Sequence, residues 1–201
     1  MLKTFNYVGS ILNADNKTNI EIAARIVKGN KTYKANAKLI KSKFLKRNTK
    51  MKIHETIIRP VVTFSSQTWT LTAKDENNLR IFERQVLRKM FGTVNIDNIW
   101  RIRNNMEIDK LIEGADIVRF IKAQRIKRLG HIQRMDQARP TRKLLDWKPM
   151  GTRPVGRPRQ WWQEDVMEDL KKLKINTWKE TAKDRRTWRD LAEKAKIHKG
   201  L

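Results

Sequence analysis

The segment from Met150 to Trp162 concentrates glycine, proline and arginine more than any other part of this chain. Its two prolines and two glycines are too many for a regular helix or a central strand. Pro158 also favours an extended backbone at Arg157, because the proline ring crowds the residue before it. We therefore expect an extended basic strip that ends at a Trp-Trp pair, with a helical body before it and a smaller one after it.

The charge of the chain is strongly positive. Its 201 residues include 46 Lys and Arg against 21 Asp and Glu, which gives a formal net charge of +25. This excess is greater than solubility requires, and its self-repulsion opposes a compact state unless a polyanion binds. Nucleic acid is the leading partner, since a duplex presents roughly one phosphate charge per 1.7 Å of axis. A merely basic soluble protein is the alternative.

Composition also excludes several classes of site. The chain has no cysteine, which excludes a disulfide framework, a thiolate zinc site and a cysteine nucleophile. Its three histidines, His54, His131 and His198, are far apart and form no ligand-spaced pair. No apolar run approaches the roughly 18 residues of a membrane span, and the first residues do not form a secretory signal. We expect an intracellular protein without a membrane partner.

Residues 3–12 alternate Phe5 and Tyr7 with polar side chains. The alternation predicts a short strand with a turn or bulge at Gly9-Ser10. A single strand cannot form a sheet, so we expect that the chain derives from a longer one.

A helix is expected next, from a capping box at Thr18 and Glu21 to about residue 44. A kink or interruption is expected at Gly29-Asn30. Its apolar residues at helical spacing are Ile22, Ile26, Tyr33, Ala37, Ile40 and Phe44.

A further helix is expected from about residue 48 to the bond before Pro60, whereas residues 61–71 fit either a strand or a Pro-kinked helix. The clearest helical pattern covers residues 72–92, with Thr72 as its cap and Gly92 as its end. The expected buried side chains of that helix are Leu79, Phe82, Val86 and Met90.

On the same helix Arg80, Arg84 and Arg88 are each four residues apart. Their row rises by about 6 Å per step, close to the phosphate repeat of an extended strand. The row is therefore a candidate phosphate contact, with an ordinary solvated basic face as the alternative.

Residues 95–114 contain a short expected helix around 107–112, and residues 115–134 form another. Arg125 and Arg128 interrupt the apolar face of the second helix. Either their stems pack while their heads reach water, or this face meets nucleic acid. The apolar residues of that face are Ile117, Phe120, Ile121, Leu129 and Ile132.

The last third begins with a weakly patterned connector at residues 137–149. After the basic strip, helices are expected over 161–173 and 177–196. The second has capping-box spacing at Thr177 and Glu180 and an apolar stripe formed by Trp188, Leu191 and Ala195.

The sequence offers few candidates for catalysis, because it has no Asp-x-Asp, no P-loop and no dinucleotide fingerprint. Four carboxylates on one helix are able to hold magnesium, but a solvated helix start that complements the helix dipole is the favoured interpretation. His131 has neither a nucleophile nor a carboxylate beside it, so a structural role is favoured. We expect no catalytic residue, metal or cofactor. The acidic group is Glu164, Asp165, Glu168 and Asp169.

The basic-aromatic pattern is stronger. Arg153, Arg157 and Arg159 precede Trp161 and Trp162, so one short segment offers phosphate contacts and stacking surfaces. Stacking of a base on an aromatic ring contributes roughly 1–3 kcal/mol and tolerates any sequence. The alternative places the two tryptophans in a core, and we expect one of the pair there.

Gly156-Arg157-Pro158 is also similar to the centre of an AT-hook, which lays arginines into a narrow minor groove. Val155 stands where such a hook has its first arginine, which weakens the match.

Several segments, in a fixed order, resemble parts of the reverse transcriptases of non-LTR retrotransposons, of the insect-type elements that encode an endonuclease and a reverse transcriptase. The likeness spans nearly the whole chain. The segments are Phe5-Asn6-Tyr7-Val8-Gly9-Ser10, Ile58-Arg59-Pro60-Val61-Val62-Thr63-Phe64, Thr68-Trp69-Thr70-Leu71, Leu79-Arg80-Ile81-Phe82-Glu83-Arg84, Arg128-Leu129-Gly130-His131 with Arg134-Met135, Gly156-Arg157-Pro158-Arg159 before Trp162 and Asp165-Val166, and Asp184-Arg185-Arg186-Thr187-Trp188.

The resemblance implies a domain order. Residues 1–15 would be a remnant of the palm, 16–136 a helical thumb-like domain, 137–160 a basic linker and 161–201 a C-terminal helical subdomain. Phe5, Tyr7 and Gly9 would belong to the primer grip, where the family often has Leu in place of Val8.

The Tyr-x-Asp-Asp motif of the family is absent from this sequence, and magnesium is expected only with that missing palm. The resemblance therefore implies an RNA-directed DNA polymerase as the parent protein, and we expect this chain to be inactive alone. Tyr is common in the family where Phe64 stands.

We expect a mainly α fold that grips RNA, DNA or an RNA–DNA hybrid in the nucleus, without a prediction of oligomeric state. The expected contacts are Arg80, Arg84, Arg88, Arg125, Arg128, Arg153, Arg157, Arg159 and Trp161. The alternatives are a stand-alone basic helical DNA-binding protein and an RNA-binding scaffold of ribosomal type. Translating the genomic sequence upstream of Met1 would separate these interpretations. An open or decayed reading frame that encodes Tyr-x-Asp-Asp would favour a reverse transcriptase fragment over both alternatives.

Overall fold

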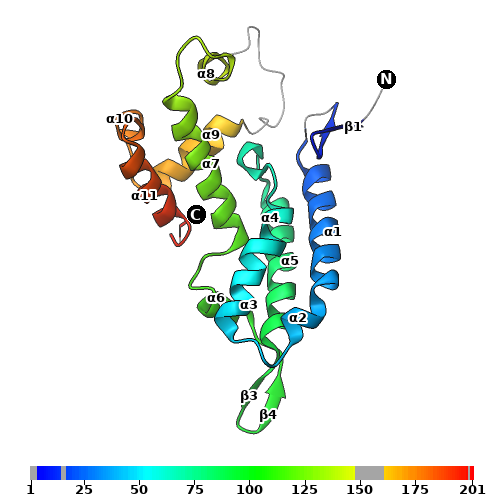
Figure 1. Ribbon diagram of the computed structural model, residues 1–201. Coiled ribbons are helices and arrows are strands. Elements are labelled where there is room, and N and C mark those ends of the chain that lie inside the picture. The colour runs from blue at the N-terminus through cyan, green and yellow to red at the C-terminus, as the bar shows by residue number, and fades with distance from the viewer. Residues whose placement is uncertain (1–3, 15–16, 148–160, 199) are drawn as a thin grey trace. The chain divides into compact units, whose positions relative to one another are not determined.

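The computed structural model describes residues 4–14, 17–147, 161–198 and 200–201 (Figure 1). The fold is mainly α, as the sequence predicts, with two small antiparallel hairpins. The chain forms two compact units: residues 1–66 with 71–118, and residues 67–70 with 119–201. The four domains expected from the family resemblance remain a prediction.

The first unit holds most of the secondary structure. Its elements are β1 Thr4–Tyr7, β2 Ser10–Asn13, α1 Asn19–Ala35, α2 Ala37–Lys41, α3 Arg47–Ile53, the π-helix η1 His54–Ile58, α4 Arg59–Val62, α5 Ala73–Phe91, β3 Val94–Ile96, β4 Ile99–Arg101 and α6 Asn105–Leu111.

The second unit is helical. The helix α7 begins at the end of the first unit. The elements are α7 Ile117–Gln133, α8 Pro140–Asp146, α9 Trp162–Lys172, α10 Trp178–Lys183 and α11 Arg185–Ala195, and the 3-10 helix η2 Ser66–Thr68 starts at the unit boundary.

The N-terminal segment is a hairpin rather than a single strand. Phe5 of β1 lies opposite Leu12 of β2, and the two-residue turn between the strands has positive φ at Val8 and Gly9. The segment therefore supplies its own partner strand, so the argument from an unpaired strand to a longer parent chain does not hold.

A second hairpin, β3–β4, was not predicted. Ile96 lies opposite Ile99, and the turn residues Asp97 and Asn98 both have positive φ. Alternating apolar residues around an Asp-Asn pair are a hairpin signal, so this element was detectable from the sequence.

The first long helix ends earlier than expected. Thr18 is its N-cap but makes no side-chain cap hydrogen bond, and the break falls at Asn36. Gly29 lies inside the helix, where an added Cβ would come within 2.4 Å of Val62 and 2.8 Å of Phe82. That glycine thus allows α1 to approach α4 and α5 closely and does not interrupt the helix. Phe44, expected in the buried stripe, is instead 98% exposed.

The helical path continues through Pro60, contrary to the expected stop there. The residues before it form the π-helix η1, in which the Arg59 N–H donates to the carbonyl of His54, five residues earlier. A π turn is wider than an α turn, which gives the proline ring room beside the preceding carbonyls. Residues 61–71 are thus the end of α4 and a 3-10 turn, not a strand.

The helix α5 agrees with its prediction. The Thr72 side chain accepts a hydrogen bond from the N–H of Asp75, and the Asp75 carboxylate accepts one from the N–H of Thr72. Gly92 ends the helix with φ of +70°. All four expected stripe residues are buried.

A buried polar cluster lies among α5, α4 and η1. The Glu83 carboxylate accepts hydrogen bonds from Arg59 (2.9 Å) and from the N–H of Ile117 (2.7 Å). His54 Nε2 is 4.0 Å from the same carboxylate. Arg59 also donates to the carbonyl of Ala115 at 3.1 Å. These contacts join the start of α7 to the centre of the first unit.

Removal from water shifts the pKa values of Glu83 and His54 in this cluster. Burial raises the pKa of the Glu83 carboxyl group, and the charge of Arg59 opposes this. Burial, followed by the charge of Arg59, lowers the pKa of His54 to about 3. His54 is therefore neutral at physiological pH.

The second unit is built around Trp188. Its Nε1 donates to the carbonyl of Ile126 at 2.9 Å, and a Cβ added to Gly130 would come within 2.0 Å of that nitrogen. Gly130 is thus the residue that lets α7 and α11 pack in contact. Ala123, Leu129, Val166 and Leu170 complete this core with their neighbours.

Two expectations for the last third were wrong. The connector at residues 137–149 contains the helix α8, and the helix expected over 177–196 is two helices that divide at Asp184. Asp184 caps α11 by accepting from the N–H groups of Arg186 and Thr187. Thr177 makes no side-chain cap hydrogen bond. In the described parts of the chain, no helix is both long enough and apolar enough to cross a bilayer.

Candidate nucleic-acid interface

The hairpin predicted to resemble a primer grip is fastened to α1 by one arginine. Arg25 donates to Glu21 (2.6 Å) and to the carbonyl of Gly9 (2.6 Å). The other oxygen of Glu21 accepts from the N–H of Ile11 at 2.7 Å. The Arg25 guanidinium also lies over the ring of Phe64, 4.4 Å from its centroid. Arg25 therefore holds the turn of the hairpin in place, a role that the sequence did not reveal.

The predicted primer-grip residues lie on this hairpin. Phe5 and Tyr7 are on β1, with more than half of each side chain exposed. Gly9 occupies the turn with φ of +83°. Both rings are therefore accessible to a ligand.

The arginine row of α5 exists, but each member already has a partner. Arg80 contacts Glu76 (3.2 Å) and Asp116 (3.3 Å), and Arg84 lies 3.4 Å from Asp109. Arg88 donates to the carbonyl of Arg103 at 2.9 Å. A phosphate would have to compete with these contacts, which fasten residues 103–116 to α5.

On α7 the two predicted arginines differ in their surroundings. Arg125 is buried and lies 3.4 Å from Asp169 and 3.6 Å from Asp165. Lys122 is 3.7 Å from the same Asp169. Arg128 is half-buried. Arg125 thus joins α7 to α9. The sequence suggests either that its head reaches water or that it meets nucleic acid, and a buried ion pair is neither of these.

These contacts also account for the acidic group. Two of its carboxylates face Arg125, and Glu168 pairs with Lys172 at 3.0 Å, which lowers the pKa of Glu168. Within the described residues, no group of three or more metal-binding side chains is present. The basic neighbours were expected, but a solvated helix start describes only Glu164 and Glu168, which are exposed. Asp169 is buried against Arg125 and Lys122 instead.

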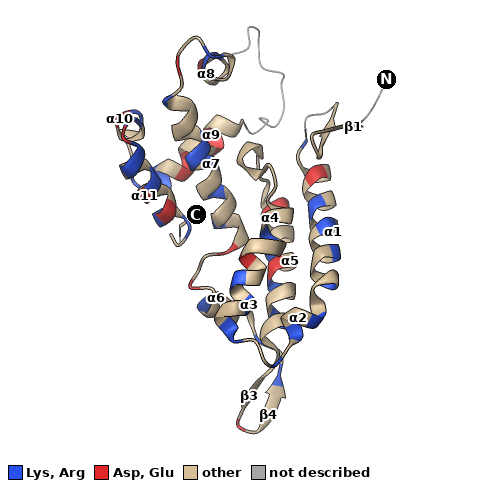
Figure 2. Cartoon of the chain, viewed as in Figure 1, with Lys and Arg blue, Asp and Glu red and all other residues tan. Residues whose placement is uncertain are grey.

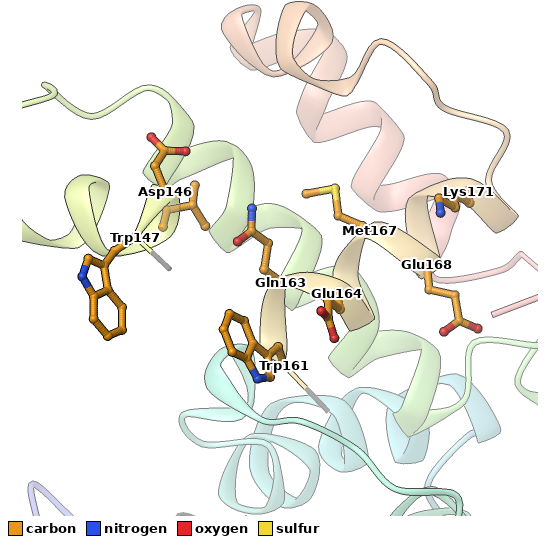
Figure 3. A pocket seen from close by; sticks show the side chains of 9 residues that line it. Asp146, Trp147, Trp161, Gln163, Glu164, Met167, Glu168 and Lys171 are labelled. Atoms are coloured by element: carbon orange, nitrogen blue, oxygen red, sulfur yellow. The ribbon is translucent and has the colours of Figure 1, made fainter. Parts of the chain in front are cut away.

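The tryptophan pair opens α9. Trp162 packs against the core of the second unit, and its Nε1 donates to the carbonyl of Gln67 at 2.7 Å. Trp161 lines a depression of about 540 Å³ formed by α8 and α9, together with Trp147 (Figure 3). Asp146, Glu164 and Glu168 also line it, and Lys171 is the lining cation. This acidic wall disfavours phosphate. Arg153, Arg157 and Arg159, with the rest of the predicted strip, lie outside the described residues.

A different basic surface is more prominent. Between Glu21 and Glu55 the sequence has eleven Lys and Arg and no acidic residue. Arg25 is the buried one, and the other ten are exposed or half-exposed on α1, α2, α3 and their connections (Figure 2). They are Lys28, Lys31, Lys34, Lys38, Lys41, Lys43, Lys46, Arg47, Lys50 and Lys52. We call these ten residues the lysine face.

The lysine face differs from the arginine row in its partners. In the described part of the chain, no carboxylate forms an ion pair with any of the ten. On α1 these lysines are exposed, whereas Ile22, Gly29 and Tyr33 are buried. The lack of acidic residues between Glu21 and Glu55 could have indicated from the sequence that these cations have no acidic partner nearby in the chain.

Comparison with known proteins gives one informative result. A Caenorhabditis elegans protein described as transposon-derived is 23% identical to this chain over 148 residues, which is 71% of this chain and 53% of that protein. The chain thus spans about half the length of the relative that it matches. No family model and no solved structure match it. The chain is therefore similar in sequence to a transposon-derived protein.

Proposed function

We propose that this chain is the thumb and C-terminal nucleic-acid-binding part of a non-LTR retrotransposon reverse transcriptase. In this role it grips a template–primer through backbone phosphates and performs no chemistry itself. The ordered motifs and the similarity to a transposon-derived protein support the origin. The lysine face is the observation that supports the grip.

The lysine face is a better candidate for phosphate contacts than the arginine row of α5, because of its charge and because its cations form no ion pairs with carboxylates in the described part of the chain. Each of the ten cations can contact a phosphate without first leaving a carboxylate. Each contact releases a counterion from the nucleic acid, which makes binding weaken steeply as salt rises. The arginines of α5, by contrast, would lose their contacts to Asp109, Asp116 and the Arg103 carbonyl.

The proposal is tested by measuring the affinity of the purified chain for duplex, hybrid and single strand in a salt series. Between roughly 50 and 200 mM salt, affinity should fall by orders of magnitude. Replacing Lys31, Lys34 and Lys38 with glutamine should lower the salt slope by roughly one unit per lost contact. Salt-insensitive binding, or no binding at low salt, contradicts the proposal.

A matched variant controls for total charge. Lys171, Lys172 and Lys174 of the second unit are also exposed, but they adjoin the four carboxylates of α9. Replacing them with glutamine changes the net charge equally and should leave the salt slope nearly unchanged. Equal effects of the two triple variants would show that only net charge matters.

Polymerase activity is expected to need residues that this sequence lacks. We expect no template-dependent nucleotide incorporation by the purified chain with magnesium and a primed template. Any incorporation would contradict this part of the proposal. Location in the nucleus follows from the same proposal, and imaging of a tagged chain tests it.

A further inference from the structure

The connection between α2 and α3 presents one aromatic ring to solvent. Phe44 is 98% exposed, the highest value among the described large apolar side chains that are exposed. Its N–H donates to the Ser42 hydroxyl at 3.3 Å, and helices begin and end within three residues of it. The ring therefore projects from a short connection held at both ends.

The residues around this ring are cationic. Lys41, Lys43, Lys46 and Arg47 flank Phe44 in sequence. The Arg47 guanidinium lies 5.7 Å from the centroid of the Phe91 ring, at the end of α5, which ties this connection to the centre of the first unit. A single exposed apolar residue is ordinary on a protein surface, but an exposed ring with four cations within three residues of it in sequence has the composition of single-strand binding surfaces.

Charge and shape together select among possible ligands. The cations fit phosphates, and the face of the ring fits the π-face of a base. A lipid surface would match a broad apolar face beside the charges, whereas within the described residues 42–46 Phe44 is the one fully exposed apolar side chain. A paired base inside a duplex would first have to unstack, so an unpaired base is the better fit.

We infer that the α2–α3 connection is a stacking site for an unpaired nucleobase, with Phe44 as the platform and its four flanking cations as phosphate ligands. This inference rests on the proposed function, because it places one contact within the lysine face. On a primed template the site accepts a base of the single-stranded portion.

The test compares two substitutions that keep apolar bulk at this position. Phe44→Leu removes the aromatic face and Phe44→Trp retains it. Each full-length variant is titrated against a blunt duplex and against the same duplex with a single-stranded overhang containing 2-aminopurine. Circular dichroism and the thermal midpoint should not change, since the side chain makes little contact with the protein.

Loss of one stacked base corresponds to roughly a 5- to 150-fold loss of affinity. We expect that loss for Phe44→Leu on the overhang substrate, with weaker quenching of 2-aminopurine. Affinity for the blunt duplex should stay at the wild-type value, and Phe44→Trp should bind the overhang like the wild type.

Three outcomes overturn the inference. The first is unchanged overhang binding by Phe44→Leu, and the second is an equal loss on both substrates. The third is binding of the wild type to phosphatidylserine vesicles but not to the overhang, which assigns the connection to a membrane surface. Failure of the wild type to bind either nucleic acid contradicts the proposed function itself, so the two failures are distinguishable.

Discussion

Acidic side chains decide which of the many basic residues remain available to a polyanion. Asp116 forms an ion pair with Arg80, and Asp109 forms one with Arg84. Asp169 forms an ion pair with Arg125. The partly exposed pairs of Arg80 and Arg84 contribute little to stability, but they still compete with an incoming phosphate, whereas Arg125 is buried. The position of the acids along the chain therefore says more about the interface than the number of bases does.

His54 gives a prediction about protonation. Because its folded pKa is about 3 against an ordinary value of 6.5, His54 binds up to one proton fewer in the folded chain than in the unfolded chain between about pH 3 and pH 6.5. The stability contributed by neutral His54 is thus present above pH 6.5 and is lost as pH falls toward 3.

NMR of the His54 ring checks this. From pH 7.5 to 5 its signals should stay constant in the folded chain and should titrate near pH 6.5 in urea. A folded-state midpoint above pH 6 would contradict the buried, Arg59-facing position.

Gly130 gives a prediction about packing. Gly130→Ala places a methyl group against the Trp188 ring, so the second unit should lose about 1–3 kcal/mol of unfolding free energy. Urea unfolding followed by tryptophan fluorescence measures the loss. His131→Ala, at the exposed neighbouring position, is the control and should change it by less than about 0.5 kcal/mol.

At the scale of elements, the caps of two helices can be compared directly. Thr72 caps α5 with its side chain, whereas Thr177 at α10 makes no such bond. Thr72→Ala should therefore cost about 1 kcal/mol of unfolding free energy, and Thr177→Ala clearly less. Equilibrium urea unfolding of both variants decides, and equal losses would contradict the capping argument.

The hairpin anchor predicts a local effect. Arg25→Lys cannot reproduce the fork that joins Glu21 to the Gly9 carbonyl, because an ammonium lacks the planar pair of donors. Amide exchange at Ile11, whose N–H donates to Glu21, should speed up several-fold while α5 amides keep their protection. Equal acceleration in both places would indicate global destabilisation instead.

Local patterns predicted some elements well and others not at all. The helix α5 was predictable because its cap, its apolar stripe and its terminal glycine all agree. Thr177 and Glu180 have the same capping spacing, yet no side-chain cap forms at Thr177, since spacing alone does not fix the backbone. Arg125 is buried against carboxylates of α9 that only the tertiary fold brings to it. Glu21 is a local partner of Arg25, but the Gly9 carbonyl and the Phe64 ring reach Arg25 only through the tertiary fold. Phe44 fitted the helical period, but α2 ends before reaching it.

At the scale of the whole molecule, the net charge of +25 sets the response to salt. Screening at higher ionic strength weakens repulsion among like charges. The thermal midpoint should therefore rise when sodium chloride increases from roughly 50 to 300 mM. Scanning calorimetry in that series measures it, with sucrose at matched osmolality as a control for solvent exclusion. A midpoint that falls would mean that the ion pairs dominate.

The π-helix before Pro60 has a consequence for how this region tolerates length changes. Its wide turn contains one residue more than an α turn of the same rise. Deleting a single residue among Glu55, Thr56 and Ile57 would restore α geometry and leave the residues before and after it at nearly the same angles around the helix axis. Arg59 would keep its place beside Glu83, and the cations of α3 would keep their direction. The π turn thus contains one residue that this region can lose without turning the basic surface away from the anchored core.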